Sequence, residues 1–218
     1  MMSDTKIAMM SDTKIAAEAL TLLVDVETAT IGHIRSDGFM VPEIQCLTEG
    51  IRIAGTALTV SLPGDDGTAL VRALSVAKPG DILVIARPGD DRHACWGAVT
   101  TAAARAAGVV GVVLDGYVTD LAAIRASGLP VWCRGRSPVT TKNRSGGTVS
   151  GEVRCGGAVV RAGDLVLADE NGVYAAAPAA ALAAAREALV IQAAEPAIIA
   201  RLAAGETMAV VYGLAPQS

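Results

Sequence analysis

Short apolar runs alternate with stretches of helical composition through the middle of the chain. Residues 81–86 (DILVIA) and 109–114 are apolar without a polar interruption, which is typical of strands buried on both faces of a parallel sheet. Residues 68–77, 93–107 and 119–127 have helical composition, and glycines follow the last two, as they commonly do at helix ends. This alternation predicts an α/β fold in which helices cover a mostly parallel sheet.

The flanking regions predict further elements of both kinds. Gly55 interrupts a strand-like pattern and predicts a bulge there. Pro196 suits the first position of a helix, so the alanine-rich C-terminal region predicts two helices that meet at this residue. A polar stretch rich in Ser, Thr and Gly, residues 134–151, predicts a long surface loop. The other predicted elements are a helix over 14–29, strands over 51–62, 129–133, 153–160, 165–168 and 172–176, and helices over 178–194 and 196–204.

Composition limits the classes of protein to which the chain can belong. Its 218 residues are 52% hydrophobic and 18% charged, and because no linker-like segment divides them we expect one domain over residues 17–218. The formal net charge is −4, no long basic run occurs and aromatic residues make up only 3%, so nucleic acid is not an expected partner. No apolar run is long enough to cross a bilayer, and the N-terminus lacks the apolar core of a signal peptide. We therefore expect a cytoplasmic protein that is not bound to a membrane.

The chain begins with a perfect duplication. The segment MMSDTKIA at residues 1–8 recurs at residues 9–16. Such a repeat at the very start is more typical of a start-site artefact than of a functional repeat. Residues 1–16 are therefore left out of the predicted domain.

The cysteines do not have the spacing of a metal or redox motif. Cys46, Cys95, Cys133 and Cys155 are far apart in the sequence, which is typical of small buried hydrophobic residues in a reducing compartment. Cys95 has one alternative role, that of a catalytic thiol with His33 or His93 as its base.

Two carboxylates follow the second buried strand. Asp115-Gly116 is predicted to end that strand, and Thr119-Asp120 to begin the next helix. The carboxyl ends of buried strands form the edge at which α/β proteins usually place their chemistry. A structural interpretation is also open, because Asp115 suits a turn, Thr119 suits an N-cap, and an acid after an N-cap is favoured by the helix dipole.

Four segments together resemble the RraA-like family, which includes class II aldolases acting on 4-hydroxy-4-methyl-2-oxoglutarate and the regulator of ribonuclease E activity. The segments are PGDILVIA, GVVGVVLDGYVTD, GLPVWCRGRSP and VRCGGAVVRAGDLVLADENGV, and the resemblance covers about residues 20–212. It implies a single α/β domain of the swivelling β/β/α type. It also implies assembly as homotrimers or homohexamers, with sites at the subunit interfaces.

The resemblance assigns roles to residues at the predicted strand end. In the aldolases of this family an arginine binds the carboxylate of the pyruvyl group, and the next residue, an aspartate, holds a divalent metal, mostly through waters. By this resemblance Asp120 is the metal residue, Mg²⁺ or Mn²⁺ is the cofactor, and Gly97, Ala98 and Val99 bind substrate. The chain departs from the family's pattern twice, because Thr119 stands at the arginine position and Ala98 at that of an upstream acid.

These two departures remove groups with specific chemistry. An arginine fork grips a carboxylate through two parallel charge-assisted hydrogen bonds, whereas Thr119 can give one neutral bond and Ala98 cannot move a proton. Losing such a partner in a closed site costs on the order of 2–5 kcal/mol. Arg87 and Arg92 are candidate replacement cations, or else solvated loop arginines. His93 is a candidate general base, or else a polar residue at a helix start.

Two functions from different classes remain open. The first is a divalent-metal-dependent carbon–carbon lyase that forms an enolate from a small 2-oxo acid, by aldol cleavage or by decarboxylation. Thr119 would belong to its site, and so would Glu206, which weakly matches an acid that reaches the neighbouring subunit's site in the aldolases and is otherwise a solvated acid. The second is a non-catalytic binding or regulatory protein in which the fold has persisted while the site decayed.

Overall fold

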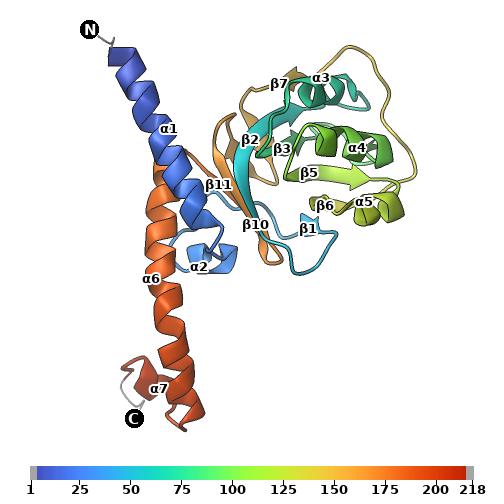
Figure 1. Ribbon diagram of the computed structural model, residues 1–218. Helices are drawn as coiled ribbons and strands as arrows, with labels where there is room; N and C mark the ends of the chain where they lie inside the picture. The colour runs from blue at the N-terminus through green and yellow to red at the C-terminus, as the bar shows by residue number, and fades with distance from the viewer. Residues whose placement is uncertain (1–3, 215–218) are drawn as a thin grey trace.

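The computed structural model describes residues 4–214, with side chains from residue 12 onward, as a mixed α/β domain built on one large sheet (Figure 1). The main path of the sheet runs in the order β1-β6-β5-β3-β2-β10-β11, with β4 beside β5 and β7 beside β2, and β8 and β9 form a separate hairpin. The strands are β1 (Gln45–Cys46), β2 (Ile53–Ser61), β3 (Asp81–Ala86), β4 (Ala94–Trp96), β5 (Gly111–Val118), β6 (Val131–Arg136), β7 (Thr148–Val149), β8 (Val153–Cys155), β9 (Ala158–Val160), β10 (Leu165–Asp169) and β11 (Gly172–Ala176).

The centre of the sheet is parallel and buried on both faces, as the apolar runs predict. β2, β3, β5 and β6 pair in parallel, so the carboxyl ends of β3, β5 and β6 meet at one edge. Side chains alternate between two cores: Leu83 and Leu114 face the helices, whereas Val84 and Val113 pack toward the β8–β9 hairpin. The predicted α/β class and the swivelling β/β/α architecture are confirmed.

The helices form two groups. On one face of the sheet lie α3 (Thr68–Val76), α4 (Ala98–Ala106) and α5 (Leu121–Ser127), which are seen at the right of Figure 1. α1 (Asp4–Leu23), α2 (Thr28–Gly32) and α6 (Pro178–Ala203) pack together at the β10–β11 end, around a third core. α7 (Met208–Val211) follows at the far end of α6 (Figure 1). Among the described helices, none is both long and apolar enough to cross a membrane.

Two predicted elements next to the parallel edge are wrong. Residues 94–96, predicted as helix, form β4 and pair with β5, so α4 begins only at Ala98. The strand predicted to end at Leu114 continues to Val118, because Tyr117 and Val118 pair with both β4 and β6 after an irregular register. Asp115 and Gly116 therefore lie within β5, and the predicted turn at these residues does not exist.

The structure corrects four other predictions. Gly55 lies in regular register, not in a bulge, and a side chain there would place its Cβ 2.6 Å from the Gly80 carbonyl oxygen. Pro196 lies inside the unbroken α6, at the cost of one helical hydrogen bond. The predicted loop over 134–151 contains the end of β6 and all of β7. The predicted first helix, residues 14–29, is divided into α1 and α2, and α1 runs through the duplicated segment from residue 4.

The loop that follows β6 is anchored by a single buried carboxylate, that of Asp66. It accepts hydrogen bonds from the backbone and hydroxyl of Thr68 at 2.8 and 2.7 Å, and from the backbone amides of Arg144 and Gly146. These bonds, led by that from the Thr68 hydroxyl, hold the pKa of the Asp66 carboxyl well below its ordinary value of 3.8. The loop is thereby tied to the start of α3.

The low pKa of Asp66 predicts a specific dependence of stability on pH. A carboxyl whose folded-state pKa is depressed stabilises the fold above its unfolded-state pKa, and this contribution is lost as the pH falls through the folded value. We expect Asp66→Asn to lower the melting temperature at pH 7 and to show a smaller further loss than the wild type between pH 5 and pH 2. Calorimetry over this range measures the difference, and parallel curves for the two proteins would contradict the assignment.

Candidate functional site

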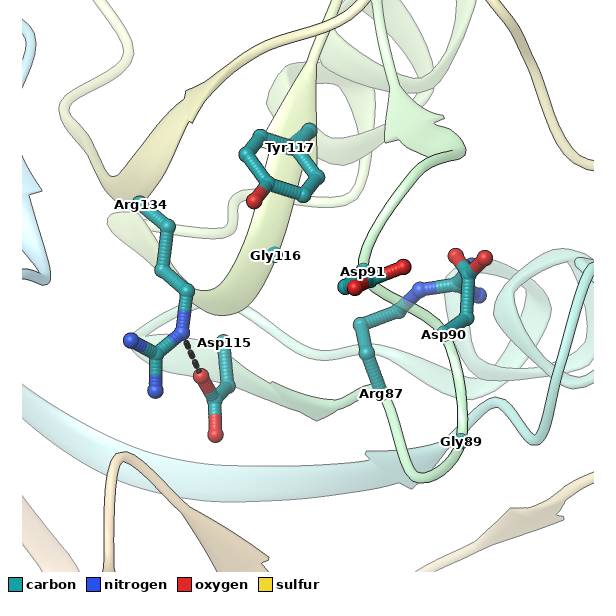
Figure 2. Close-up of a pocket in the computed structure, with 8 residues that line it drawn as sticks. All are labelled: Arg87, Gly89, Asp90, Asp91, Asp115, Gly116, Tyr117 and Arg134. Carbon is teal, nitrogen blue, oxygen red and sulfur yellow. Dashed lines mark hydrogen bonds and ion pairs between the residues drawn. The ribbon is translucent and has the colours of Figure 1, made fainter.

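Two cavities open at the edge where β3, β5 and β6 end. The first, here called the Asp120 cavity, has a volume of about 260 Å³ and is lined by Val118, Thr119, Asp120, Leu121, Arg136, Ser137 and Pro138. The second, the Asp115 cavity, has a volume of about 480 Å³ and is lined by Arg87, Gly89, Asp90, Asp91, Asp115, Gly116, Tyr117 and Arg134 (Figure 2). Such an edge of an α/β sheet is the usual place for a ligand.

Asp120 has a backbone conformation that directs its carboxylate away from its own helix. Its φ of 51° and ψ of 40° are left-handed, a conformation that costs on the order of 1–3 kcal/mol in a residue other than glycine and recurs at functional sites. Asp120 is the N-cap of α5, yet its side chain caps no amide of that helix. Its Oδ2 instead accepts the backbone N–H of Ala98, at 3.0 Å, at the start of α4. The carboxylate thus joins two helix starts at the cavity mouth.

The helix-start interpretation of Thr119-Asp120 is corrected by this geometry. Thr119 is not the N-cap, and its backbone N–H donates to the Trp96 carbonyl at 2.8 Å. Gly97 lies directly under the carboxylate, since a Cβ at this position would lie 2.6 Å from Asp120 Oδ2. A glycine is therefore required there for the carboxylate to reach the α4 terminus.

The start of α4 offers further hydrogen-bond donors. The first N–H groups of a helix have no partner within it. Ala98 N–H is used by Asp120, whereas Val99 N–H has no acceptor among the described residues. The predicted substrate-binding residues Gly97, Ala98 and Val99 are thus placed around Asp120. The positive end of the α4 dipole favours negative charge there.

Asp120 is the one carboxylate in the described lining of its cavity that could bind a divalent metal. Nowhere in the described part of the chain do three carboxylate, thiol or imidazole groups gather as a ready ligand set. Asp120 Oδ1, however, has no hydrogen-bond partner among the described residues. Mg²⁺ commonly keeps several waters and binds proteins through one or two carboxylates. The residues present therefore fit Mg²⁺ or Mn²⁺ held by one carboxylate and water.

The Asp115 cavity contains charges that already neutralise one another. Asp115 pairs with Arg134 on one side, and its Oδ2 accepts the Gly156 N–H at 2.8 Å (Figure 2). Arg87 pairs with Asp90 on the other side, where Asp91 also lies. With three carboxylates against two arginines, this cavity is less suited to an anion than the Asp120 cavity.

The predicted replacement cation Arg87 is enclosed by protein. Its side chain is 1% exposed and points toward Asp90, and it also donates to the carbonyls of Leu62 and Gly64. Burial of Asp90 opposes its ionisation, but the hydrogen bonds from His93 and Arg87 outweigh this and lower the pKa of the Asp90 carboxyl. His93 Nδ1 lies 2.7 Å from Asp90 Oδ1. Arg87, Asp90 and His93 thus form one network beside the Asp115 cavity.

The structure separates the remaining predicted residues from the Asp120 cavity. Arg92 is exposed and lines neither cavity. Glu206 pairs with Arg201 at 2.6 Å at the far end of α6, and a role in a neighbouring subunit stays a prediction. Cys95 is buried, and burial raises the pKa of its thiol to about 12, so the thiolate that a nucleophile needs is not available near neutral pH.

Sequence reasoning missed Arg134 and Arg136 at the end of β6. Both lie in the segment GLPVWCRGRSP, at the start of the stretch that the sequence predicts as a surface loop. Their position in the sequence could have identified them, because they follow the apolar part of β6. The carboxyl end of β6 lies at the same edge of the sheet as that of β5, after which Asp120 follows. Arg136 is exposed, lines the Asp120 cavity, and forms no hydrogen bond or ion pair among the described residues.

Two known proteins are similar to this chain in sequence. A protein of Halalkalibacterium halodurans named "Putative 4-hydroxy-4-methyl-2-oxoglutarate aldolase" is 35% identical over 130 residues, which are 60% of this chain and 62% of that protein. The chain thus matches less than two thirds of this relative's length. A second relative, an uncharacterized protein of Methanocaldococcus jannaschii, is 34% identical over 59% of its own length.

Solved structures show the same fold. Streptomyces coelicolor RraAS2, described as an unusual member of the RNase ES inhibitor RraA protein family, is 26% identical with a TM-score of 0.72, over 82% of this chain and 94% of that one. An uncharacterized protein of Pseudomonas syringae shares the fold with a TM-score of 0.79 at 24% identity, over 90% and 93% of the two chains. The RraA-like family model, described as Aldolase/RraA, matches residues 11–174, and the chain therefore belongs to the RraA-like family.

Proposed function

We propose that this protein is a divalent-metal-dependent carbon–carbon lyase that acts on a small 2-oxo acid in the Asp120 cavity. The observation that carries the proposal is the arrangement of Asp120, whose carboxylate is held on the start of α4 with Oδ1 free beside a cavity lined by an unpaired arginine. The relative from Halalkalibacterium halodurans supports the class of reaction.

Each group has a defined task in this proposal. Asp120 would hold Mg²⁺ or Mn²⁺, and the ion would supply positive charge for an oxygen that becomes negative as an enolate forms. The Val99 N–H, at the positive end of α4 beside the residue that binds Asp120, would be available to a substrate oxygen. The apolar side chains of Val118 and Leu121 provide a wall against which the short body of the substrate would pack.

The lining of the cavity favours decarboxylation over aldol cleavage. Aldol cleavage requires a base that takes the proton of the 4-hydroxyl group, but position 98 is alanine and the described lining has no titratable base apart from Asp120. Decarboxylation of a 2-oxo acid with a carboxylate on C3 needs no such base. The bond between C3 and that carboxylate breaks, carbon dioxide leaves, and the electron pair forms the enolate, which takes a proton from water at C3.

Release of pyruvate tests this proposal. Oxaloacetate and a 4-hydroxy-2-oxo acid are offered with Mg²⁺, with Mn²⁺ and with a chelator, and pyruvate is followed in each case. We expect metal-dependent release, faster from oxaloacetate, above the background that free metal produces in a parallel reaction with Asp120→Ala. Release equal to that background for every substrate would refute a lyase.

A non-catalytic binding role is the second candidate, and Ala98 and Thr119 favour it because neither can move a proton or grip a carboxylate. It predicts a folded protein that binds an anion or partner without turnover. A protein that binds metal and anion but releases no pyruvate would support this role over the lyase.

A further inference from the structure

Arg136 differs from the other arginines at this edge because it has no partner among the described residues. Arg87 is buried against Asp90, and Arg134 is paired with Asp115. Arg136, at the end of β6, lies in register with Val118 of β5, directly before Thr119 and Asp120. Arg136 lines the Asp120 cavity, where it is the one cationic residue of the described lining.

The other lining groups define the chemistry that this cavity accepts. Val118, Leu121 and Pro138 are apolar, and Thr119 and Ser137 add one hydroxyl each. The volume of about 260 Å³ is slightly below the usual ~300–1,000 Å³ of drug-sized sites. A ligand that fits is therefore small, with one carboxylate for a cation and a short body against apolar walls. A short 2-oxo acid has this form.

We propose that Arg136 binds the substrate carboxylate, and so provides from β6 the cation that position 119 lacks. This inference rests on the proposed function for the site, because it uses the same cavity and the same ligand class. A guanidinium matches a carboxylate with two parallel charge-assisted hydrogen bonds, which a threonine hydroxyl cannot reproduce. With a metal held by Asp120, Arg136 would bind the same 2-oxo acid through its carboxylate, since both residues line one cavity.

Direct binding of oxalate tests the inference without turnover. Oxalate is a stable dicarboxylate with the planar shape of an enolate, and isothermal titration in saturating Mg²⁺ measures its affinity. We expect Arg136→Gln to weaken oxalate binding by about 10- to 100-fold, and Arg136→Lys to fall between this variant and the wild type. Arg105→Gln, which removes an exposed arginine at the other end of α4, serves as the matched control and is expected to leave the affinity unchanged.

A second variant returns an arginine to the cavity at another position. It tests whether the affinity depends on a guanidinium in the cavity. Thr119→Arg in the Arg136→Gln background is expected to recover at least part of the lost affinity, because the guanidinium returns to the same cavity from the residue that follows β5. Mg²⁺ affinity, titrated alone, is expected to be the same in all these variants. Folding is checked by circular dichroism and should persist, since Arg136 is exposed.

The outcomes distinguish failure of this inference from failure of the proposed function. Equal oxalate affinity in Arg136→Gln and Arg105→Gln would overturn the role of Arg136 and leave the metal-dependent site standing. A wild type that binds Mg²⁺ but no oxalate would also overturn it. A wild type that binds neither would refute both proposals.

Discussion

Replacing Asp120 with alanine is expected to abolish the stabilisation of this protein by Mg²⁺. Asp120 is the carboxylate of the described site with a free oxygen, so the variant retains no ligand of that type there. A metal at 100 times its dissociation constant adds about 2.7 kcal/mol to the free energy of unfolding. For a chain of this size that corresponds to roughly 5–11 °C in melting temperature. We expect this shift in the wild type and none in Asp120→Ala.

Thermal melts with Mg²⁺, Mn²⁺ and a chelator measure this effect. Asp91→Ala is the matched control, because it removes an exposed carboxylate of the same edge that has no partner among the described residues. Asp120→Asn separates charge from shape, since an amide oxygen can still accept the Ala98 N–H but carries no charge for the metal. A full metal-dependent shift in Asp120→Ala would mean that the ion binds elsewhere.

Replacing Asp169 with alanine is expected to cause the largest loss of stability, about 3 kcal/mol. Asp169 is 1% exposed and ends β10. Its carboxylate accepts the backbone N–H of Thr28 at 2.8 Å, the Thr28 hydroxyl, and the backbone N–H of Asn171 at 2.9 Å. The variant leaves the two donors of Thr28, a residue that is 2% exposed, buried without an acceptor, and α2 loses its polar link to the sheet.

Urea unfolding measures the loss as a lower midpoint at an unchanged slope. Asp169→Asn keeps one acceptor oxygen and the shape of the side chain, so its loss should be clearly smaller. The Trp132 Nε1–H bond to Asp169, at 2.8 Å, uses the backbone carbonyl and should survive in both variants. Equal stability of the wild type and Asp169→Ala would show that the carboxylate does not hold α2 in place.

The sequence predicted the parallel core well because its signal is local. A run such as DILVIA has the length and apolar character of a buried strand, and β3 covers the same six residues. β4 was missed because residues 94–96 are held as a strand only by their long-range pairing with β5, while their neighbours have helical composition. The Asp115-Gly116 turn was wrong for a similar reason, because pairing with β4 and β6 carries β5 past a typical turn signal.

The structure brings Asp120 beside Gly97 and Ala98, residues to which the resemblance assigns metal and substrate binding. These roles stay predictions. The resemblance could not identify a cation opposite Asp120. Arg87 was a reasonable candidate by position, but its burial against Asp90 depends on side-chain packing that spacing does not encode. Arg136 depends on the register between β5 and β6, which only the folded sheet defines.

The most direct test of the Asp120 site is the position of a bound metal. Crystals grown with Mn²⁺ and oxalate give an anomalous signal that locates the ion independently of any assay. The site described above predicts the strongest peak in the Asp120 cavity, either bonded to the carboxylate or one water away, with an oxalate carboxylate toward Arg136. A strongest peak in the Asp115 cavity, or elsewhere in the protein, would contradict it.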